Sequence, residues 1–365
     1  MKGESMDIRT VSLFSFTLCL ASWAEGQSEK TPVAYQPQPQ LNQAYALERK
    51  PSKQVQAEYQ FTVRAPNLKA QEWVLFASSP PTLPSQTVNI ASLTPHGRTI
   101  SELSPLQRSL FMARIPASVE QNSQTVTVKL QTRAELYSRN LVPRRVAGKQ
   151  SDFSLSAEKA AAALGDNDLL KLDSKVLGSW LDEHGLHPRP REGEIDFARR
   201  VFLTIKQRFK YVYESDMDRT VSRMCVAEKS DCGGMALMFT AAMRKHGIPA
   251  RLLVGRWANS AKAGETVGDI TYYQEHVKAE FFAAGVGWVA VDLSSGVLHD
   301  KSREGLRYFG HDPGDFITLH VDCLLMVDTI HFGKEPITWL QGAQYWVTGS
   351  GNLDATKIEE KWTVK

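Results

Sequence analysis

The chain has 365 residues, of which 42% are hydrophobic and 23% are charged, and its formal net charge is +3. These values describe an ordinary globular protein that is long enough for two domains. So small a charge does not indicate a nucleic-acid partner, and the sequence has neither a basic block interleaved with aromatic residues nor a glycine-rich phosphate loop. Composition therefore leaves open an enzyme that acts on a neutral or mixed substrate and a protein-binding module.

The N-terminus has the pattern of a secretory signal peptide. A charged opening precedes an apolar run over residues 11–20, and Ser22 and Ala24 supply small residues at the expected cleavage positions. We therefore expect an exported protein, periplasmic or secreted, from which residues 1–24 are removed. No second segment of transmembrane length follows, so no stable membrane span is expected afterwards. A leader that is retained as an anchor is the alternative.

Two regions of different composition follow the leader. Residues 25–54 are rich in Gln, Pro, Lys and Ser, which is typical of a disordered linker. Residues 55–143 contain short runs of strand-forming residues separated by Pro, Gly and Asn, and this pattern predicts a small β-sandwich. The clearest runs are residues 59–63, 73–77, 109–113 and 125–130.

Helical periodicity dominates residues 157–212. Three amphipathic stretches predict helices that pack beside a later, more apolar helix. The polar segment from residue 214 to residue 230 is expected to be a solvated loop at the border of a functional site.

The more apolar helix is predicted over residues 232–246. Asp231 can cap its first turn, Gly247 can take the left-handed conformation that ends a helix, and Pro249 prevents continuation. Cys232 then lies on the first turn, where unpaired N–H groups and the positive end of the helix dipole favour a thiolate over a thiol. A nucleophilic cysteine is expected at such a position.

Two antiparallel strands are predicted over residues 276–282 and 288–293, joined by a glycine-containing turn. His276 opens the first strand and Asp292 lies near the end of the second. Residues in these positions of neighbouring antiparallel strands can lie side by side. With Cys232 they form a Cys/His/Asp set suited to nucleophilic catalysis.

Several of these segments together resemble the transglutaminase-like superfamily. They are Asp-Cys-Gly-Gly at 231–234, Gly-Ile-Pro-Ala-Arg at 247–251, His-Val-Lys-Ala-Glu at 276–280 and Gly-Trp-Val-Ala-Val-Asp at 287–292. The resemblance implies an α+β fold with a papain-like core over residues 155–325, in which helices pack on an antiparallel sheet behind the β-sandwich. Residues 326–365 are then a C-terminal extension, too short for the additional β domains of the calcium-dependent crosslinking enzymes.

The resemblance also implies catalytic roles. Cys232 is expected to be the nucleophile, His276 the base, and Asp292 the residue that orients the imidazole and stabilises its protonated form. The backbone N–H of Cys232 is a natural oxyanion donor, and Tyr211 and Tyr213 are candidates for a side-chain donor.

Other residues around the predicted site have simpler interpretations. Many family members carry tryptophan directly after the cysteine, so Gly233 predicts a cleft that is open on that side. Trp257 and Trp288 are expected to be core aromatics. Arg219 is expected in the solvated loop, and Glu275 on the rim of the site.

No cofactor and no metal are predicted. The sequence has no C-x-x-C pair, so a structural zinc site is unsupported. A disulfide between Cys225 and Cys232 is conceivable in an oxidising compartment, but it would silence the nucleophile and is not expected.

The sequence thus predicts thiol-dependent acyl transfer, with hydrolysis of amide or peptide bonds as the first choice. Transfer to an amine acceptor, as in protein crosslinking, is the second. A non-catalytic module that binds envelope or protein partners is the third. The expected partner is a protein or peptide substrate, with the cell envelope as one source, and not a nucleic acid.

Overall fold

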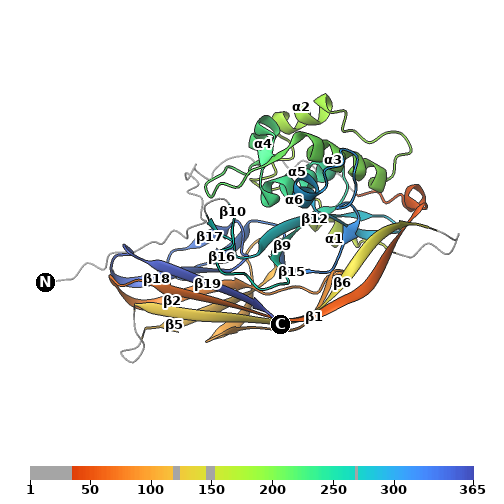
Figure 1. The fold of residues 1–365 in the computed structure, drawn as a ribbon. Helices are drawn as coiled ribbons and strands as arrows, with labels where there is room; N and C mark the ends of the chain where they lie inside the picture. The colour runs from red at the N-terminus through yellow and green to blue at the C-terminus, as the bar shows by residue number, and fades with distance from the viewer. Residues whose placement is uncertain (1–34, 118–123, 145–152, 268–269) are drawn as a thin grey trace.

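The computed structural model describes residues 35–117, 124–144, 153–267 and 270–365, and its fold is mixed α+β, as predicted. A four-stranded antiparallel sheet lies between a layer of helices and a two-sheet β-sandwich (Figure 1). The predicted leader lies outside the described residues. Among the described helices, none is long and apolar enough to cross a membrane.

The sandwich contains the long strands of the N-terminal region and several strands from the end of the chain. Its strands are β1 (Tyr45–Arg64), β2 (Leu68–Ser78), β3 (Gln86–Thr94), β4 (Gly97–Ser101), β5 (Ser109–Pro116), β6 (Thr125–Pro143), β14 (His311–Asp312), β18 (Ala343–Gly351) and β19 (Lys357–Val364). One sheet has the order β14-β6-β1-β19, with β3 also pairing with β6, and the other has the order β18-β2-β5-β4. All four predicted runs lie within these strands, and alternate residues of β6 face the apolar core.

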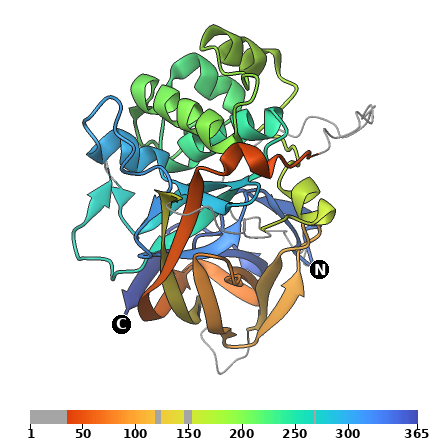
Figure 2. The same ribbon diagram turned by 90° about the vertical axis from the view of Figure 1, so that its right-hand side faces the viewer.

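The C-terminal segment completes the sandwich, where we expected an extension over residues 326–365. Strand β19 pairs antiparallel with β1, and β18 pairs antiparallel with β2. Figure 2 shows the last strand, in dark blue, on the sandwich side of the molecule with the first strands. Tyr345 and Trp362 are only 1% and 3% exposed in the core between the sheets. The two ends of the chain therefore fold as one unit.

Part of the predicted linker is also ordered. A short 3-10 helix, η1 (Pro39–Asn42), precedes β1. Asn42 is fully buried, and its Nδ2 donates to Glu194 Oε2 at 2.5 Å and to the Ala284 carbonyl at 3.1 Å. Polar composition suggested disorder here, but these contacts tie the segment to the helical layer.

The second part of the fold has six described helices and one main sheet. The helices are α1 (Ala157–Ala162), α2 (Lys175–Glu183), α3 (Glu194–Arg208), α4 (Val221–Ala227), α5 (Cys232–Lys245) and α6 (Leu293–His299). The main strands are β9 (Ala250–Trp257), β12 (Glu275–Ala283), β13 (Gly287–Val291) and β15 (Phe316–Val321), in the order β13-β12-β9-β15. The short strands are β7 (Lys210–Tyr211), β8 (Lys229–Ser230), β10 (Thr266–Val267), β11 (Ile270–Thr271), β16 (Leu325–Asp328) and β17 (Lys334–Ile337).

Helix α5 is the central helix of this part and matches the prediction within one residue at its end. Its residues from Gly233 to Arg244 are all buried, as expected for a helix that is apolar on every side. Asp231 caps the first turn, since its Oδ1 accepts from Gly234 N at 3.1 Å. Gly247 has φ +72°, the left-handed conformation expected beyond the helix end.

The segment from residue 214 to residue 230, expected to be a loop, contains α4. The side chain of Thr220 accepts from Arg223 N and caps this helix, while Val221, Met224 and Cys225 are buried against the core. Seven residues are too few for a clear periodic pattern, so the sequence alone does not predict this helix.

Buried charges join the sandwich to the central sheet. Arg139 on β6 is 0% exposed, and its guanidinium binds Glu280 on β12 at 2.7 Å and Asp312 at 2.9 Å. Burial opposes ionisation of Glu280, yet Arg251 and Arg139 hold its pKa below the usual value. These ion pairs fix the position of β12 against the sandwich.

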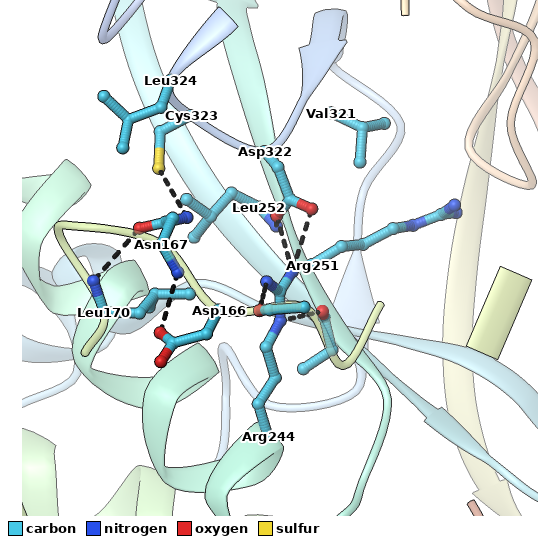
Figure 3. A network of polar contacts seen from close by, with 12 residues as sticks. Asp166, Asn167, Leu170, Arg244, Arg251, Leu252, Val321, Asp322, Cys323 and Leu324 are labelled. Atoms are coloured by element: carbon cyan, nitrogen blue, oxygen red, sulfur yellow. Dashed lines mark hydrogen bonds and ion pairs between the residues drawn. The ribbon is translucent and has the colours of Figure 1, made fainter. Parts of the chain in front are cut away.

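A second polar network holds the C-terminal end of α5 (Figure 3). Both Asp322 carboxylate oxygens accept from Arg244 Nη2 at 2.9 Å, and Oδ1 also accepts from Leu252 N. Arg108, between the sandwich strands β4 and β5, donates to the carbonyls of Val321 and Asp322 at 2.8 and 3.0 Å. The turn after β15 is therefore clamped from both parts of the fold.

The packing of strand β19 into the sandwich predicts the effect of a substitution on stability. Trp362→Ala should lower the free energy of unfolding by about 3–5 kcal/mol, because it empties a buried aromatic site. It also removes the 2.9 Å hydrogen bond from Trp362 Nε1 to the Trp257 carbonyl. Urea unfolding followed by circular dichroism measures the loss. The control is Lys361→Ala on the exposed face of the same strand, and equal stability of the two variants would contradict the packing of β19.

Candidate active site

The thiol of Cys232 is placed by the start of α5 and the start of β12. Cys232 is the first helical residue and is partly exposed, while the capping Asp231 is buried. The backbone N–H of Val277 favours the ionised sulfur and lowers the thiol pKa, and both residues line one cavity. Because Val277 directly follows His276, the thiol lies against the strand that carries the predicted base.

His276 and Asp292 are in direct contact. Nε2 of the imidazole lies 2.9 Å from Asp292 Oδ2, and both residues are buried. The last ladder pair between the two strands is Ala279 with Val291, so Asp292 lies just past the ladder, diagonal to His276. The predicted histidine–carboxylate contact is therefore present in the structure.

Asp292 is held in place by the helix that it caps. Its Oδ1 accepts from Ser295 N at 3.0 Å, and its Oδ2 accepts from Ser295 Oγ at 2.9 Å. Burial opposes ionisation, but the charge and hydrogen bond of His276 keep the Asp292 pKa well below its usual value. An ionised carboxylate can only accept, so Nε2 of the ring carries the proton and Nδ1 is left as the acceptor.

Trp257 fixes the plane of the imidazole ring. The two rings stack with centroids 4.5 Å apart and an interplanar angle of 23°, and Phe316 approaches the imidazole edge at 6.0 Å. Sequence analysis treated Trp257 as an ordinary core aromatic. The contact arises from the pairing of β9 with β12, so no local pattern around Trp257 predicts it.

Burial opposes ionisation of the free thiol, although Cys232 as a whole residue is partly exposed. Desolvation raises the pKa of Cys232, and the nearby Asp231 raises it further, while the Val277 N–H and Arg219 lower it. Burial and Asp231 thus oppose the thiolate that the start of the helix is expected to favour. An ionised sulfur in this site requires a positive partner.

Arg219 neutralises the acidic residue beside the thiol. Its Nε and Nη2 donate to Asp231 Oδ2 at 2.8 and 2.6 Å, and the side chain is buried. Sequence analysis placed Arg219 in a solvated loop. Without this guanidinium, the Asp231 carboxylate would disfavour a negative sulfur next to it.

The thiol opens into a cavity of about 190 Å³. Its aromatic lining residues are Tyr211, Tyr213, Tyr272, Tyr273 and Trp339. Burial raises the pKa values of Tyr211, Tyr213 and Tyr272. A negative charge on Cys232 also raises the pKa of each of the three. Their hydroxyls therefore stay protonated and can donate hydrogen bonds near the sulfur. Tyr272 is an additional candidate that sequence analysis did not single out.

Two carboxylates also line the cavity. Glu275 and Glu360 both bind the guanidinium of the buried Arg256, at 2.8 and 2.9 Å. Burial and the neighbouring Glu360 raise the pKa of Glu275 to about 7, against the lowering effect of Arg256. Glu275 does lie at the site, as expected, but it is tied to Arg256 and not freely solvated.

A C-terminal segment between β17 and β18 also forms part of the site. Gln341 Nε2 donates to the carbonyl of Gly255 at 2.9 Å and to that of His276 at 3.0 Å. It thus bridges β9 and β12 where the imidazole is attached. Gln341 lies far from the core in the sequence, and nothing local signals this role.

The remaining sequence candidates lie apart from the site. Cys225 is buried with its sulfur 3.8 Å from Met238 Sδ, and the three cysteines within the described part of the chain are all free. In those same described ranges, no group of three or more His, Cys, Asp or Glu side chains is arranged to hold a metal ion.

A family model described as the transglutaminase-like superfamily matches residues 188–293. This stretch contains Cys232, His276 and Asp292. None of the curated proteins matches the sequence significantly.

Solved structures give distant likenesses. A candidate cysteine protease from Cytophaga hutchinsonii has 10% identity and a TM-score of 0.49, with 87% of this chain and 100% of that chain covered. The periplasmic domain of TgpA from Pseudomonas aeruginosa has 13% identity and a TM-score of 0.30, with 68% and 91% covered. A candidate protease from Parabacteroides distasonis has 10% identity and a TM-score of 0.25, with 60% and 62% covered.

Proposed function

We propose that this chain, whose residues 188–293 match the family model of the transglutaminase-like superfamily, performs thiol-dependent acyl transfer. Its first activity is hydrolysis of amide or peptide bonds, with Cys232 as nucleophile, His276 as base and Asp292 as the residue that orients the base. The observation that carries this proposal is the 2.9 Å contact of His276 with Asp292, on the strand whose Val277 N–H lowers the pKa of the thiol.

Because the pKa of the thiol is raised, we infer that the imidazole must accept the thiol proton. Because burial disfavours a lone thiolate, the proton of Cys232 must move to a group that remains next to the sulfur. Nδ1 of His276 is that group, and Asp292 stabilises the imidazolium that results. Within the described residues no hydrogen bond yet joins the sulfur to the ring, and such catalytic hydrogen bonds often tighten only when substrate binds.

The reaction then follows acyl-transfer chemistry. The Cys232 thiolate attacks the substrate carbonyl carbon, the C–N bond breaks, and His276 returns the proton to the leaving amine. A thioester to Cys232 remains. His276 next takes a proton from water, the resulting hydroxide attacks the thioester, and the thiol is regenerated as the carboxylic acid leaves.

The oxyanion of each tetrahedral intermediate needs donors close to the sulfur. The Cys232 N–H lies at the start of α5, where no carbonyl of the same helix is available to it. Tyr211, Tyr213 and Tyr272 line the same cavity with neutral hydroxyls, so one of them supplies the second donor.

Transfer to an amine is the second candidate, and one observation favours it. Glu275 and Glu360 share a single guanidinium on the cavity wall, so above the Glu275 pKa of about 7 the wall carries a net negative charge that attracts ammonium groups. Water remains the first acceptor because it needs no dedicated site. As an exported protein, the enzyme would meet proteins and peptides outside the cytoplasm, including those of the cell envelope.

The roles of Cys232 and His276 can be tested by alkylation with iodoacetamide across pH, read by peptide mapping. Labelling of Cys232 should begin at lower pH in the wild type than in His276→Ala, because without the imidazole the buried thiol keeps its proton to higher pH. Asp292→Asn should lie between them. Buried Cys225, whose pKa burial raises to about 12, is the internal control. Superimposable profiles for wild type and His276→Ala would favour the non-catalytic binding module.

The side-chain oxyanion donor can be identified by single Tyr→Phe variants at positions 211, 213 and 272. One of them should lower kcat by about 10²–10³, the usual effect of losing an oxyanion donor, with little change in KM. Tyr273→Phe is the matched control, since Tyr273 lines the cavity but burial and Glu360 are the main influences on its pKa. Near-normal kcat in all three variants would remove the side-chain donor from the mechanism.

The acceptor can be determined with casein, in the presence and absence of a fluorescent primary amine. We expect casein fragments that carry no label, and their loss in Cys232→Ala. Label incorporated into intact casein would instead favour transfer. If purified wild type gives neither product on casein or on a panel of peptide amides, the hydrolytic proposal fails.

A further inference from the structure

Trp339 occupies the space beside the nucleophile that the sequence predicts to be open. A Cβ atom placed on Gly233 would lie 3.3 Å from Trp339 Cζ2 and 3.5 Å from its Cη2. Contacts below about 3.4 Å are tighter than ordinary van der Waals contacts, so any side chain at Gly233 would compete with the indole. The wall of the cleft next to Cys232 is therefore built by a residue from the C-terminal segment and not by the residue after the cysteine.

The main chain around Trp339 is fixed by hydrogen bonds to both parts of the fold. The carbonyl of Thr338 accepts from Leu324 N at 3.1 Å. The N–H of Leu340 donates to His320 Nε2 at 3.1 Å, and its carbonyl accepts from Ser78 Oγ at 2.6 Å. With both neighbours held, the backbone that carries the indole is fixed in place.

Trp339 also shares the cavity with the thiol. Both side chains belong to its lining, and the indole packs against the core of the helical part although it is only partly buried. A cavity of about 190 Å³ is smaller than the roughly 300–1,000 Å³ of sites for drug-sized ligands. The space beside Cys232 is therefore small, and the indole is one of the side chains that limit its size.

We propose that Trp339 is the specificity-determining residue of this site. It selects acyl donors, proteins or peptides, whose side chain next to the reacting carbonyl is small, and it excludes large or branched ones. The inference rests on the proposed acyl transfer at Cys232 and adds the substrate preference of that site. The selectivity comes from the C-terminal segment, so it depends on the sandwich that holds this segment.

The wall can be tested without turnover, by alkylation of Cys232 with reagents of different size. Wild type should react much faster with iodoacetamide than with N-phenyl iodoacetamide. Trp339→Ala should reduce this ratio about tenfold or more, the scale of discrimination expected of a pocket wall. Trp339→Phe should give an intermediate ratio, and it keeps the test valid if the alanine variant does not fold. Ile330→Ala, at an exposed position between β16 and β17, is the control.

Moving the tryptophan from position 339 to position 233 tests whether the indole itself limits the size of the space. Because residues 233 and 339 compete for one space, the double variant Gly233→Trp/Trp339→Ala should recover part of the wild-type size discrimination. Gly233→Trp alone should lose folding or reactivity through the clash. A purely structural role for Trp339 predicts no such recovery.

Peptide amides with Gly, Ala, Leu or Phe before the reacting carbonyl complete the test. Wild type should prefer Gly and Ala, and Trp339→Ala should shift kcat/KM toward Leu and Phe. An unchanged size preference in folded Trp339→Ala or Trp339→Phe, in labelling and in turnover, would overturn the inference. Size-dependent labelling without turnover of any substrate would instead overturn the proposed function and leave the wall in place.

Discussion

The contact between the start of helix α5 and the start of strand β12 is the constraint on which the site depends. The Val277 N–H lowers the pKa of the Cys232 thiol, and the preceding residue on the same strand is His276. Burial at this contact raises the thiol pKa, so the proposed mechanism needs a charge partner for the ionised sulfur. In that mechanism the helix terminus places the nucleophile, and the strand supplies the charge partner.

Strand β12 can serve this role because it is held from several sides. Trp257 and Gln341 fix the ring and the backbone of His276, while Arg139 binds Glu280 further along the strand. A buried ion pair adds little net stability on its own, but breaking one leaves a buried charge unpaired at a cost of about 3–5 kcal/mol. Arg139 therefore fixes the position of the strand more than it adds to overall stability.

The cleft joins segments from both ends of the molecule. The residues that would carry the chemistry come from the helical layer and central sheet, whereas Trp339 and Gln341 precede β18, which belongs to the sandwich. The sandwich itself closes only when β19 pairs with β1. The N-terminal β domain is thus structurally coupled to the cleft, because the part of the chain that completes this domain also forms one wall of the cleft.

The sequence by itself determined the local features of this protein. Capping at Asp231 and the glycine and proline after the helix define α5, and two strand-forming runs joined by a glycine-containing turn define the strands around His276 and Asp292, because these signals depend on neighbours a few residues apart. The tertiary structure alone decided what lies far apart in the chain: the stack of Trp257 on His276, the bond from Gln341, the pair of Arg219 with Asp231, and Trp339 over Gly233. Strand pairing and buried charge make those contacts, and neither leaves a periodic pattern in the sequence.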